Sequence, residues 1–240
     1  NTAPMRIALD FSSLDEATAI PYSTCFRVGE WYRRGLPAQK TPPATAAEAT
    51  GVRGPNEWQS AQNGCWGVCE LGDLVTPKGA QMIADTVRDT VSEIEGLLAV
   101  APLANLQFTV GPGNFQHLLS QKGYPTPSLC AADCQNLYNV AVPDAYCTAG
   151  VAADAVLSIT RPASFEGVAG SGTHCISNDD GRPLWLVFAW YSQSSSSTAP
   201  SGSRALVLHE ILHSLGFSNA GFRDALNSDG TPKNLIALKQ

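Results

Sequence analysis

The 240-residue sequence has no excess of positive charge and no long apolar run. Its formal net charge is −6, and its densest basic stretch is the pair Arg33-Arg34, so it offers no surface that would follow a phosphate backbone. The longest apolar run, Leu184 to Tyr191, has the length of a strand and falls far short of the ~20 residues that cross a bilayer. These absences exclude nucleic acid as a partner and a transmembrane segment within this chain.

Charged residues make up only 15% of the chain, whereas hydrophobic residues make up 44%. This balance excludes a disordered polymer or a coiled coil and predicts a globular protein of one large domain or two small ones. The chain starts at Asn1 without an initiator Met or an apolar leader, so we expect a processed product. It contains no Asn-x-Ser/Thr acceptor, so N-glycosylation gives no support for secretion.

Seven cysteines are many for a reducing compartment, and they predict a disulfide-bonded extracellular or lumenal protein. The alternatives are reduced thiols or a metal site, because two pairs have the Cys-x-x-x-Cys spacing of a zinc knuckle. Gly, Pro and Asn between the cysteines favour disulfides. The odd count leaves one cysteine free or paired outside this chain. The seven are Cys25, Cys65, Cys69, Cys130, Cys134, Cys147 and Cys175.

Apolar residues that recur every three or four positions predict a long helix from Thr76-Pro77 to about Leu98. A stripe along that helix is expected to pack onto a sheet; it consists of Ile83, Val87, Val91, Ile94 and Leu98. Strands are predicted at Met5–Phe11, Leu106–Val110, Ala155–Ile159 and Leu184–Ala189, the last of them internal because it has few polar residues. The order of the elements favours an α+β or α/β layered fold with one long backing helix.

Three further stretches show no clear period. Cys25–Arg34 is ambiguous, Leu36–Pro55 is expected to be an irregular surface loop, and Gln193–Ser203 is a Ser-rich spacer expected to form a flexible loop.

The segment that carries chemistry is His209-Glu210-x-x-His213, within a stretch of helix-forming residues that is apolar nearly all round and therefore expected to be buried. Histidines four apart lie on the same face of a helix, about 6 Å apart at the backbone, and both imidazoles reach one tetrahedral zinc ion. Burying three ionisable groups without a partner would cost several kcal/mol, and a metal satisfies them most simply. The alternative is a chance occurrence of the motif on an exposed helix.

Glu210 lies about 100° round the helix from His209, badly placed as a ligand but well placed to touch a metal-bound water. This division of labour suits peptide hydrolysis by zinc: the ion activates the water, and Glu210 acts as general base and then as general acid. Gly216 is expected to adopt the left-handed turn that ends the helix.

A catalytic zinc site needs a third protein ligand, and the sequence leaves that ligand open. The compact motif would place a histidine at position 219, where this chain has Asn219, and no glutamate follows Glu210. Asp224 and Asp229 are available carboxylates. The two upstream histidines, His117 and His174, are more simply surface or core residues.

These residues resemble the leishmanolysin family of metzincin-like surface metallopeptidases. The resemblance to the family is most specific in the motif, from His209 to Ser218 and on to Phe222-x-Asp224-Ala225. Three other segments also resemble the family: Arg6-Ile7-Ala8, Cys25-x-Arg27-Val28-Gly29 and the stretch from Cys134 to Cys175. The resemblance implies an α+β, metzincin-like N-terminal catalytic domain, with a mixed twisted sheet, a long backing helix and a buried active-site helix. It implies disulfides Cys134–Cys175 and Cys25 with either Cys65 or Cys69, and an extracellular or cell-surface location.

In that family a long inserted domain separates the third zinc histidine from the active-site helix, and a Met-containing turn lies beneath the metal. This sequence has no histidine after His213 and no methionine after Met82. We therefore expect residues 1–218 to form the N-terminal catalytic subdomain and residues 219–240 to begin the following domain. The third ligand is then expected in a C-terminal portion of the same protein, unless the site has been lost.

The leading hypothesis is a zinc endopeptidase that acts on protein or peptide substrates, with His209 and His213 as metal ligands and Glu210 as the catalytic residue. Leu184–Ala189 is expected to be the edge strand that accepts an extended substrate by main-chain pairing. One alternative is a catalytically inactive structural or adhesion module on the same scaffold. Another keeps the enzyme and uses Asp224 as the third ligand.

Overall fold

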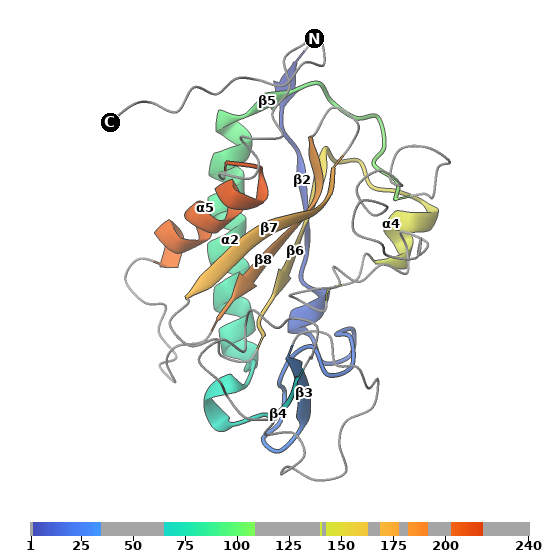
Figure 1. The fold of residues 1–240 in the computed structure, drawn as a ribbon. Helices are drawn as coiled ribbons and strands as arrows, with labels where there is room; N and C mark the ends of the chain where they lie inside the picture. The colour runs from blue at the N-terminus through green and yellow to red at the C-terminus, as the bar shows by residue number, and fades with distance from the viewer. Residues whose placement is uncertain are drawn as a thin grey trace.

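The computed structural model describes residues 2–34, 65–108, 140, 143–162, 169–177, 182–191 and 203–217. Its central element is a twisted four-stranded sheet with the strand order β2-β6-β8-β7 (Figure 1). The strands are β2 (Ile7–Asp10), β6 (Ala155–Thr160), β8 (Pro183–Trp190) and β7 (Gly170–Ser177). β2, β6 and β8 run parallel, and β7 pairs antiparallel with β8. The mixed α+β fold expected from the sequence is confirmed.

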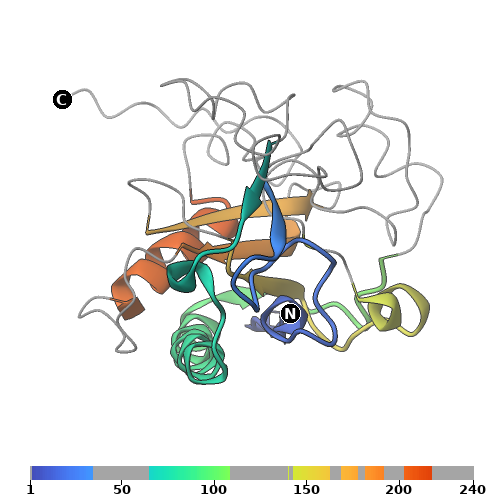
Figure 2. The ribbon, with the colours of Figure 1, turned by 90° about the horizontal axis from the view of Figure 1, so that it is seen from below.

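Two helices pack on one face of this sheet, and they lie next to each other in Figure 2. α2 (Pro77–Leu97) begins as predicted, because the side chain of Thr76 accepts a hydrogen bond from the N–H of Gly79 at 3.0 Å and Pro77 needs no N–H partner. α5 (Ser203–Ser214) crosses the same face near α2. The shared core contains Ile83, Val87, Val91, Ile94, Leu157, Ile159, Leu186, Phe188, Val207 and Ile211. The stripe predicted for α2 is therefore confirmed at its four helical positions.

The other face of the sheet carries a second core around Trp185 and Val187. Leu106 and Phe108 fill this core, but the strand predicted at Leu106–Val110 is wrong in the described residues 106–108. Leu106 forms an isolated antiparallel bridge with Val151. The segment packs the side chains of Leu106 and Phe108 onto the sheet but does not pair with any of the four strands. α4 (Asp144–Thr148) lies on the opposite side of the sheet from α5 in Figure 1.

Short pairings complete the described part. β1 (Ala3–Pro4) pairs with β5 (Ala99–Val100), and β3 (Trp31–Arg34) pairs with β4 (Cys65–Val68), both antiparallel. The ambiguous stretch Cys25–Arg34 thus ends in a strand. Two single-turn 3-10 helices, η1 (Ser12–Leu14) and η3 (Leu71–Asp73), join these elements to the sheet and to α2. The predicted loops at Leu36–Pro55 and Gln193–Ser203 lie outside the described residues, except that Ser203 begins α5.

A disulfide joins Cys25 to Cys69 and ties the start of the β3–β4 region to the segment before α2. This bond selects Cys69 between the two alternatives for Cys25, and it excludes a zinc knuckle at Cys65 and Cys69. Cys175 on β7 is also disulfide-bonded. Its predicted pairing with Cys134 falls outside the described residues and stays a prediction. The disulfides fit an oxidising compartment.

Of the helices in the described ranges, none has the length and apolar character needed to cross a bilayer.

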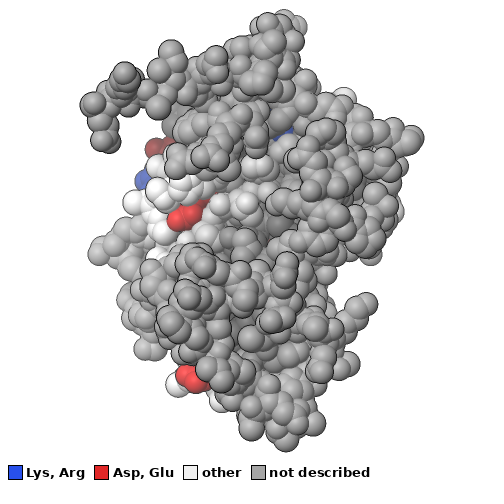
Figure 3. Space-filling view, viewed as in Figure 1, with Lys and Arg blue, Asp and Glu red and all other residues white. Residues whose placement is uncertain are grey.

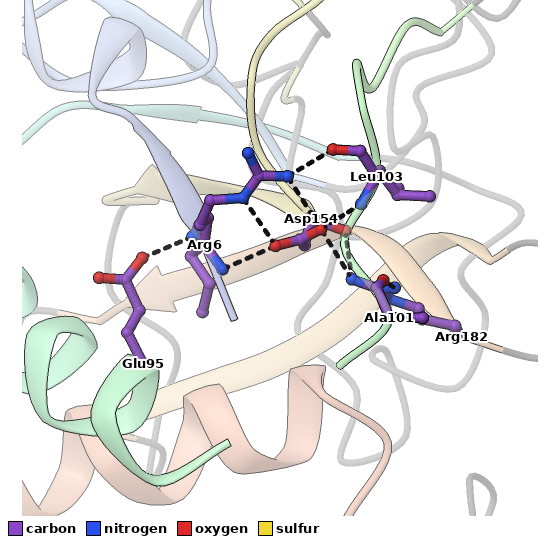
Figure 4. Close-up of polar contacts among 7 residues, drawn as sticks. Arg6, Glu95, Ala101, Leu103, Asp154 and Arg182 are labelled. Carbon is purple, nitrogen blue, oxygen red and sulfur yellow. Dashed lines mark hydrogen bonds and ion pairs between the residues drawn. The ribbon is translucent and has the colours of Figure 1, made fainter. Parts of the chain in front are cut away.

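The buried carboxylate of Asp154 forms polar contacts with several segments of the chain at the end of the sheet (Figure 4). Asp154, next to β6, accepts hydrogen bonds from the backbone N–H and Nε of Arg6, both at 3.0 Å, and from the N–H of Leu103 at 2.7 Å. Nη2 of Arg182 lies 3.4 Å from its Oδ1. Burial alone would raise the pKa of Asp154, but the hydrogen bonds from Arg6 and Leu103 and the charge of Arg6 outweigh it and lower the pKa to about 2.

Replacing Asp154 by Asn should lower the free energy of unfolding at pH 7 by about 2 kcal/mol, because the native carboxylate is ionised and hydrogen-bonded. The folded-state pKa lies below the ordinary value of 3.8, so this stabilisation is present above about pH 4 and is lost as the pH falls towards 2. Urea unfolding at several pH values should therefore show less acid sensitivity in Asp154→Asn than in the wild type. Asp85→Asn, at an exposed carboxylate on α2, is the control; equal acid sensitivity in all three proteins would contradict the assignment.

Candidate metal centre

α5 packs one side against the sheet and turns the other outward. Val207, Ile211 and Ser214 are fully buried, whereas the side chain of His209 is 64% exposed. The expectation of an active-site helix buried all round is therefore wrong, because the described elements cover only the side that faces β7, β8 and α2. Of the three residues in the motif, only Glu210 is buried, with 11% of its side chain exposed. The case for a metal then depends on the geometry of the histidines, not on their burial.

The two imidazoles converge through their Nε2 atoms, which lie 3.0 Å apart. The rings meet edge to face, with centroids 4.4 Å apart and planes at 82°. Two nitrogens bound to one tetrahedral zinc at ~2.0–2.1 Å are about 3.3 Å apart. The spacing of four residues on α5 therefore aims two imidazole nitrogens at one point, close to the separation that a shared zinc ion requires.

A backbone carbonyl sets the protonation of one of these rings. Nδ1 of His213 lies 2.9 Å from the carbonyl oxygen of Phe217. Since that oxygen only accepts hydrogen bonds, Nδ1 must carry the proton, and the lone pair of a neutral His213 lies on Nε2, which faces His209. Metal-bound histidines commonly donate their other N–H to such a carbonyl, which fixes both ring and tautomer.

The turn at the end of α5 brings that carbonyl into place. Gly216 has φ +93°, in the left-handed region that was expected from the sequence. The N–H of Phe217 donates to the carbonyl of Leu212, and the N–H of Gly216 donates to that of His213, both at 3.0 Å. This pair of bonds is a Schellman motif, which ends the helix and folds the chain back over its last turn. The glycine therefore contributes to the site by returning the Phe217 carbonyl to His213.

The carboxylate of Glu210 lies beside the histidine pair, with Oε1 4.0 Å from Nε2 of His209. Within the described ranges the carboxylate forms no hydrogen bond and no other ion pair. Glu210 thus places a carboxylate close to the two convergent nitrogens, at the protected side of the helix.

Close contact with β7 holds α5 at this position. A Cβ on Gly172 would lie 1.7 Å from the carbonyl oxygen of Glu210 and 2.7 Å from Oγ of Ser214, so only glycine fits here. Oγ of Ser214 lies 3.0 Å from the carbonyl oxygens of Val187 and Glu210 and fastens the helix to β8 as well. Sequence reasoning missed both residues, and it missed β7 itself. The available signal was the Gly-x-Gly spacing of Gly170 and Gly172, which places both on one face of a strand.

The other candidate ligands are not joined to this pair in the part of the chain that can be described. No group of three or more His, Cys, Asp or Glu side chains suited to a metal occurs there, so His174 on β7 is not brought together with His209 and His213. His117, Asn219, Asp224 and Asp229 lie outside the described residues.

The edge of the sheet differs from the expectation. β8, which contains Leu184–Ala189, lies between β6 and β7 and has no open edge, so its assignment as the edge strand is wrong. The strand at this end of the sheet is β7, which lies against α5. On the face shown in Figure 3, the described surface is mostly uncharged, with only scattered acidic and basic atoms.

A helix that presents two convergent imidazoles and a neighbouring carboxylate is typical of the active-site helix of zinc peptidases. The leishmanolysin peptidase family matches residues 121–234, which include β6, β7, β8 and α5. The chain is similar to the leishmanolysin family over this region, and the resemblance drawn from the sequence is confirmed there. Members of this family are in general zinc-dependent metallopeptidases that act on proteins. No curated protein matches the chain.

Gly172→Ala should destabilise the protein by about 3 kcal/mol or prevent folding, because its methyl group would overlap the backbone of α5. Gly96→Ala is the matched control: Gly96 lies in α2 with no atom within 4 Å of the place that a methyl group would take, so alanine should stabilise the helix by up to about 1 kcal/mol. Urea unfolding measures both changes. Equal stability of the two variants would show that the α5–β7 contact is not tight in solution.

Proposed function

We propose that the protein is a zinc-dependent endopeptidase in which His209 and His213 bind zinc through Nε2. The observation that carries this proposal is the 3.0 Å approach of the two nitrogens, with Nδ1 of His213 held by the Phe217 carbonyl. Neutral imidazole is a preferred zinc ligand, so the donors present fit the metal on which the family in general depends. The family's metzincin-like arrangement, with residues 1–218 as the catalytic subdomain and 219–240 as the start of the next, is part of the same proposal.

The third ligand is proposed to lie in the C-terminal portion of the protein. This placement follows the resemblance to the leishmanolysin family, whose model matches residues 121–234. Asp224 remains the alternative within the chain. A zinc ion bound here would polarise the scissile carbonyl and lower the pKa of a water molecule.

The residues of the chain have separate parts in the reaction. His213 is held in one tautomer by Phe217, and His209 completes the pair from one turn earlier. The Glu210 carboxylate lies next to them and is proposed to take a proton from the attacking water and to pass it to the leaving amine. Its low exposure keeps bulk water from most of the side chain, which favours a direct transfer.

The edge strand β7 is proposed to accept an extended peptide substrate through main-chain hydrogen bonds. The support for β7 in place of β8 is its position at the end of the sheet and its contact with α5. Protein or peptide substrates at the cell surface or outside the cell fit this edge and the disulfides.

Glu210→Gln should reduce peptide hydrolysis by about 10²–10⁴-fold, because the amide cannot accept the proton, and it should leave bound zinc unchanged. Turnover of a quenched fluorescent peptide mixture and the metal content of the purified full-length protein test the two parts. A variant that cleaves peptides at the wild-type rate would remove the assigned role of Glu210.

His213→Ala should weaken zinc binding at least ~100-fold, because one of few ligands and its fixed tautomer are lost. Competition with a chromophoric chelator measures the affinity, and His174→Ala is the control that should retain it. Full-length wild-type protein that holds no zinc would instead favour the inactive structural module on the same scaffold.

A further inference from the structure

We propose that Gly170 is a positioning residue for Glu210, an inference that rests on the proposed function of that carboxylate. Gly170 is the first residue of β7 and pairs with Trp190 of β8. A Cβ at this position would lie 3.3 Å from Cγ of Glu210. The lack of a side chain at Gly170 therefore provides the space that the Glu210 side chain occupies.

Gly170 and Gly172 lie on the same face of β7, since side chains two residues apart in a strand point the same way. They meet different parts of α5. Gly172 approaches the carbonyl of Glu210 and allows the helix to dock, whereas Gly170 approaches the methylene group that leads to the carboxylate. Gly172 thus supports the backbone of the helix, and Gly170 determines the path of one side chain.

The consequence of a methyl group at Gly170 follows from what surrounds it. Its three nearest atoms, all at 3.3 Å, are the carbonyl oxygen of Ala189, Cδ1 of Leu206 and Cγ of Glu210. Ordinary carbon–carbon contacts are about 3.5–4.0 Å, so neighbours must move by a few tenths of an ångström. The carbonyl of Ala189 belongs to the β7–β8 ladder and resists movement, so the side chains of Leu206 and Glu210 must yield.

A small displacement of Glu210 matters because its Oε1 lies only 4.0 Å from Nε2 of His209. Proton transfer requires donor and acceptor at about 2.6–3.2 Å, and a 1 Å misplacement costs about 10²-fold in rate. A shift of a few tenths of an ångström should then cost about tenfold. The effect is expected in kcat, because the zinc ligands and the substrate edge keep their places.

The experiment compares Gly170→Ala with wild type in the full-length zinc-loaded protein. We expect kcat to fall about tenfold, with KM, zinc affinity and the midpoint of thermal unfolding close to wild type. A second readout uses the metal-free protein with ¹³C-labelled glutamate. The Cγ resonance of Glu210, identified by its loss in Glu210→Gln, should shift in Gly170→Ala and stay in place in the control Gly96→Ala.

A double-mutant cycle separates this role from a general structural one. In the Glu210→Gln background, Gly170→Ala should have no further effect on the residual rate, because it acts through the carboxylate. In the Gly170→Ala background, Leu206→Ala removes the other side chain that must move, and kcat should stay at the Gly170→Ala value.

An unchanged kcat and an unmoved Cγ resonance would overturn the inference. So would a loss confined to KM, which would indicate a substrate contact on β7, or a loss of zinc affinity, which would indicate poor docking of α5. Failure of the proposed function is a separate result, because it would appear as wild-type hydrolysis by Glu210→Gln itself.

Discussion

The close contact between α5 and β7 is the constraint on which the rest of the site depends. At Gly172 the strand and the helix backbone approach so closely that no other residue fits, and Ser214 extends the contact to the carbonyl of Val187. Because the helix is held from this side, His209 is left on its outer face, with 64% of its side chain exposed. Glu210 lies between these two faces, with its backbone against the strand and its carboxylate near the imidazoles.

The exposure of the histidines changes the physical argument for a metal. Buried, unpaired imidazoles would demand a partner, but His209 is largely exposed and water satisfies it at little cost. What remains specific is direction: two Nε2 atoms face each other, and a backbone carbonyl holds one ring by its other nitrogen. At 3.0 Å the Nε2–H of a neutral His209 can donate a hydrogen bond to the Nε2 lone pair of His213, and a shared cation would take the place of that proton.

The sequence predicted the elements that depend on local periodicity. The α2 stripe, the Thr76 cap, the buried strand around Leu186 and the turn at Gly216 all follow from spacing and residue type, and each is present. β7 was missed because its glycines and polar residues carry no strand pattern; it becomes a strand by pairing with β8 and by the contact of Gly170 and Gly172 with α5. The assignment of β8 as the edge failed for the same reason, since a sheet edge is a property of strand order, which one strand's sequence does not contain.

The histidine pair was predictable because i and i+4 geometry lies within one helix. The hydrogen bond between His213 and the Phe217 carbonyl was harder to predict, because the Schellman turn is what brings that carbonyl to the ring. The same distinction holds for Asp154, whose partners Arg6 and Leu103 are distant in sequence. Asp154 joins the segment before β2 to the start of β6. These strands form one half of the sheet, and the glycines that contact α5 lie on β7, at the opposite edge. The buried carboxylate and the two glycines thus act at opposite edges of one sheet. The ion pair of Asp154 with Arg6 holds the β2 edge, and the missing side chains of Gly170 and Gly172 let α5 pack on the β7 edge. The strands β6 and β8 lie between these edges and join them.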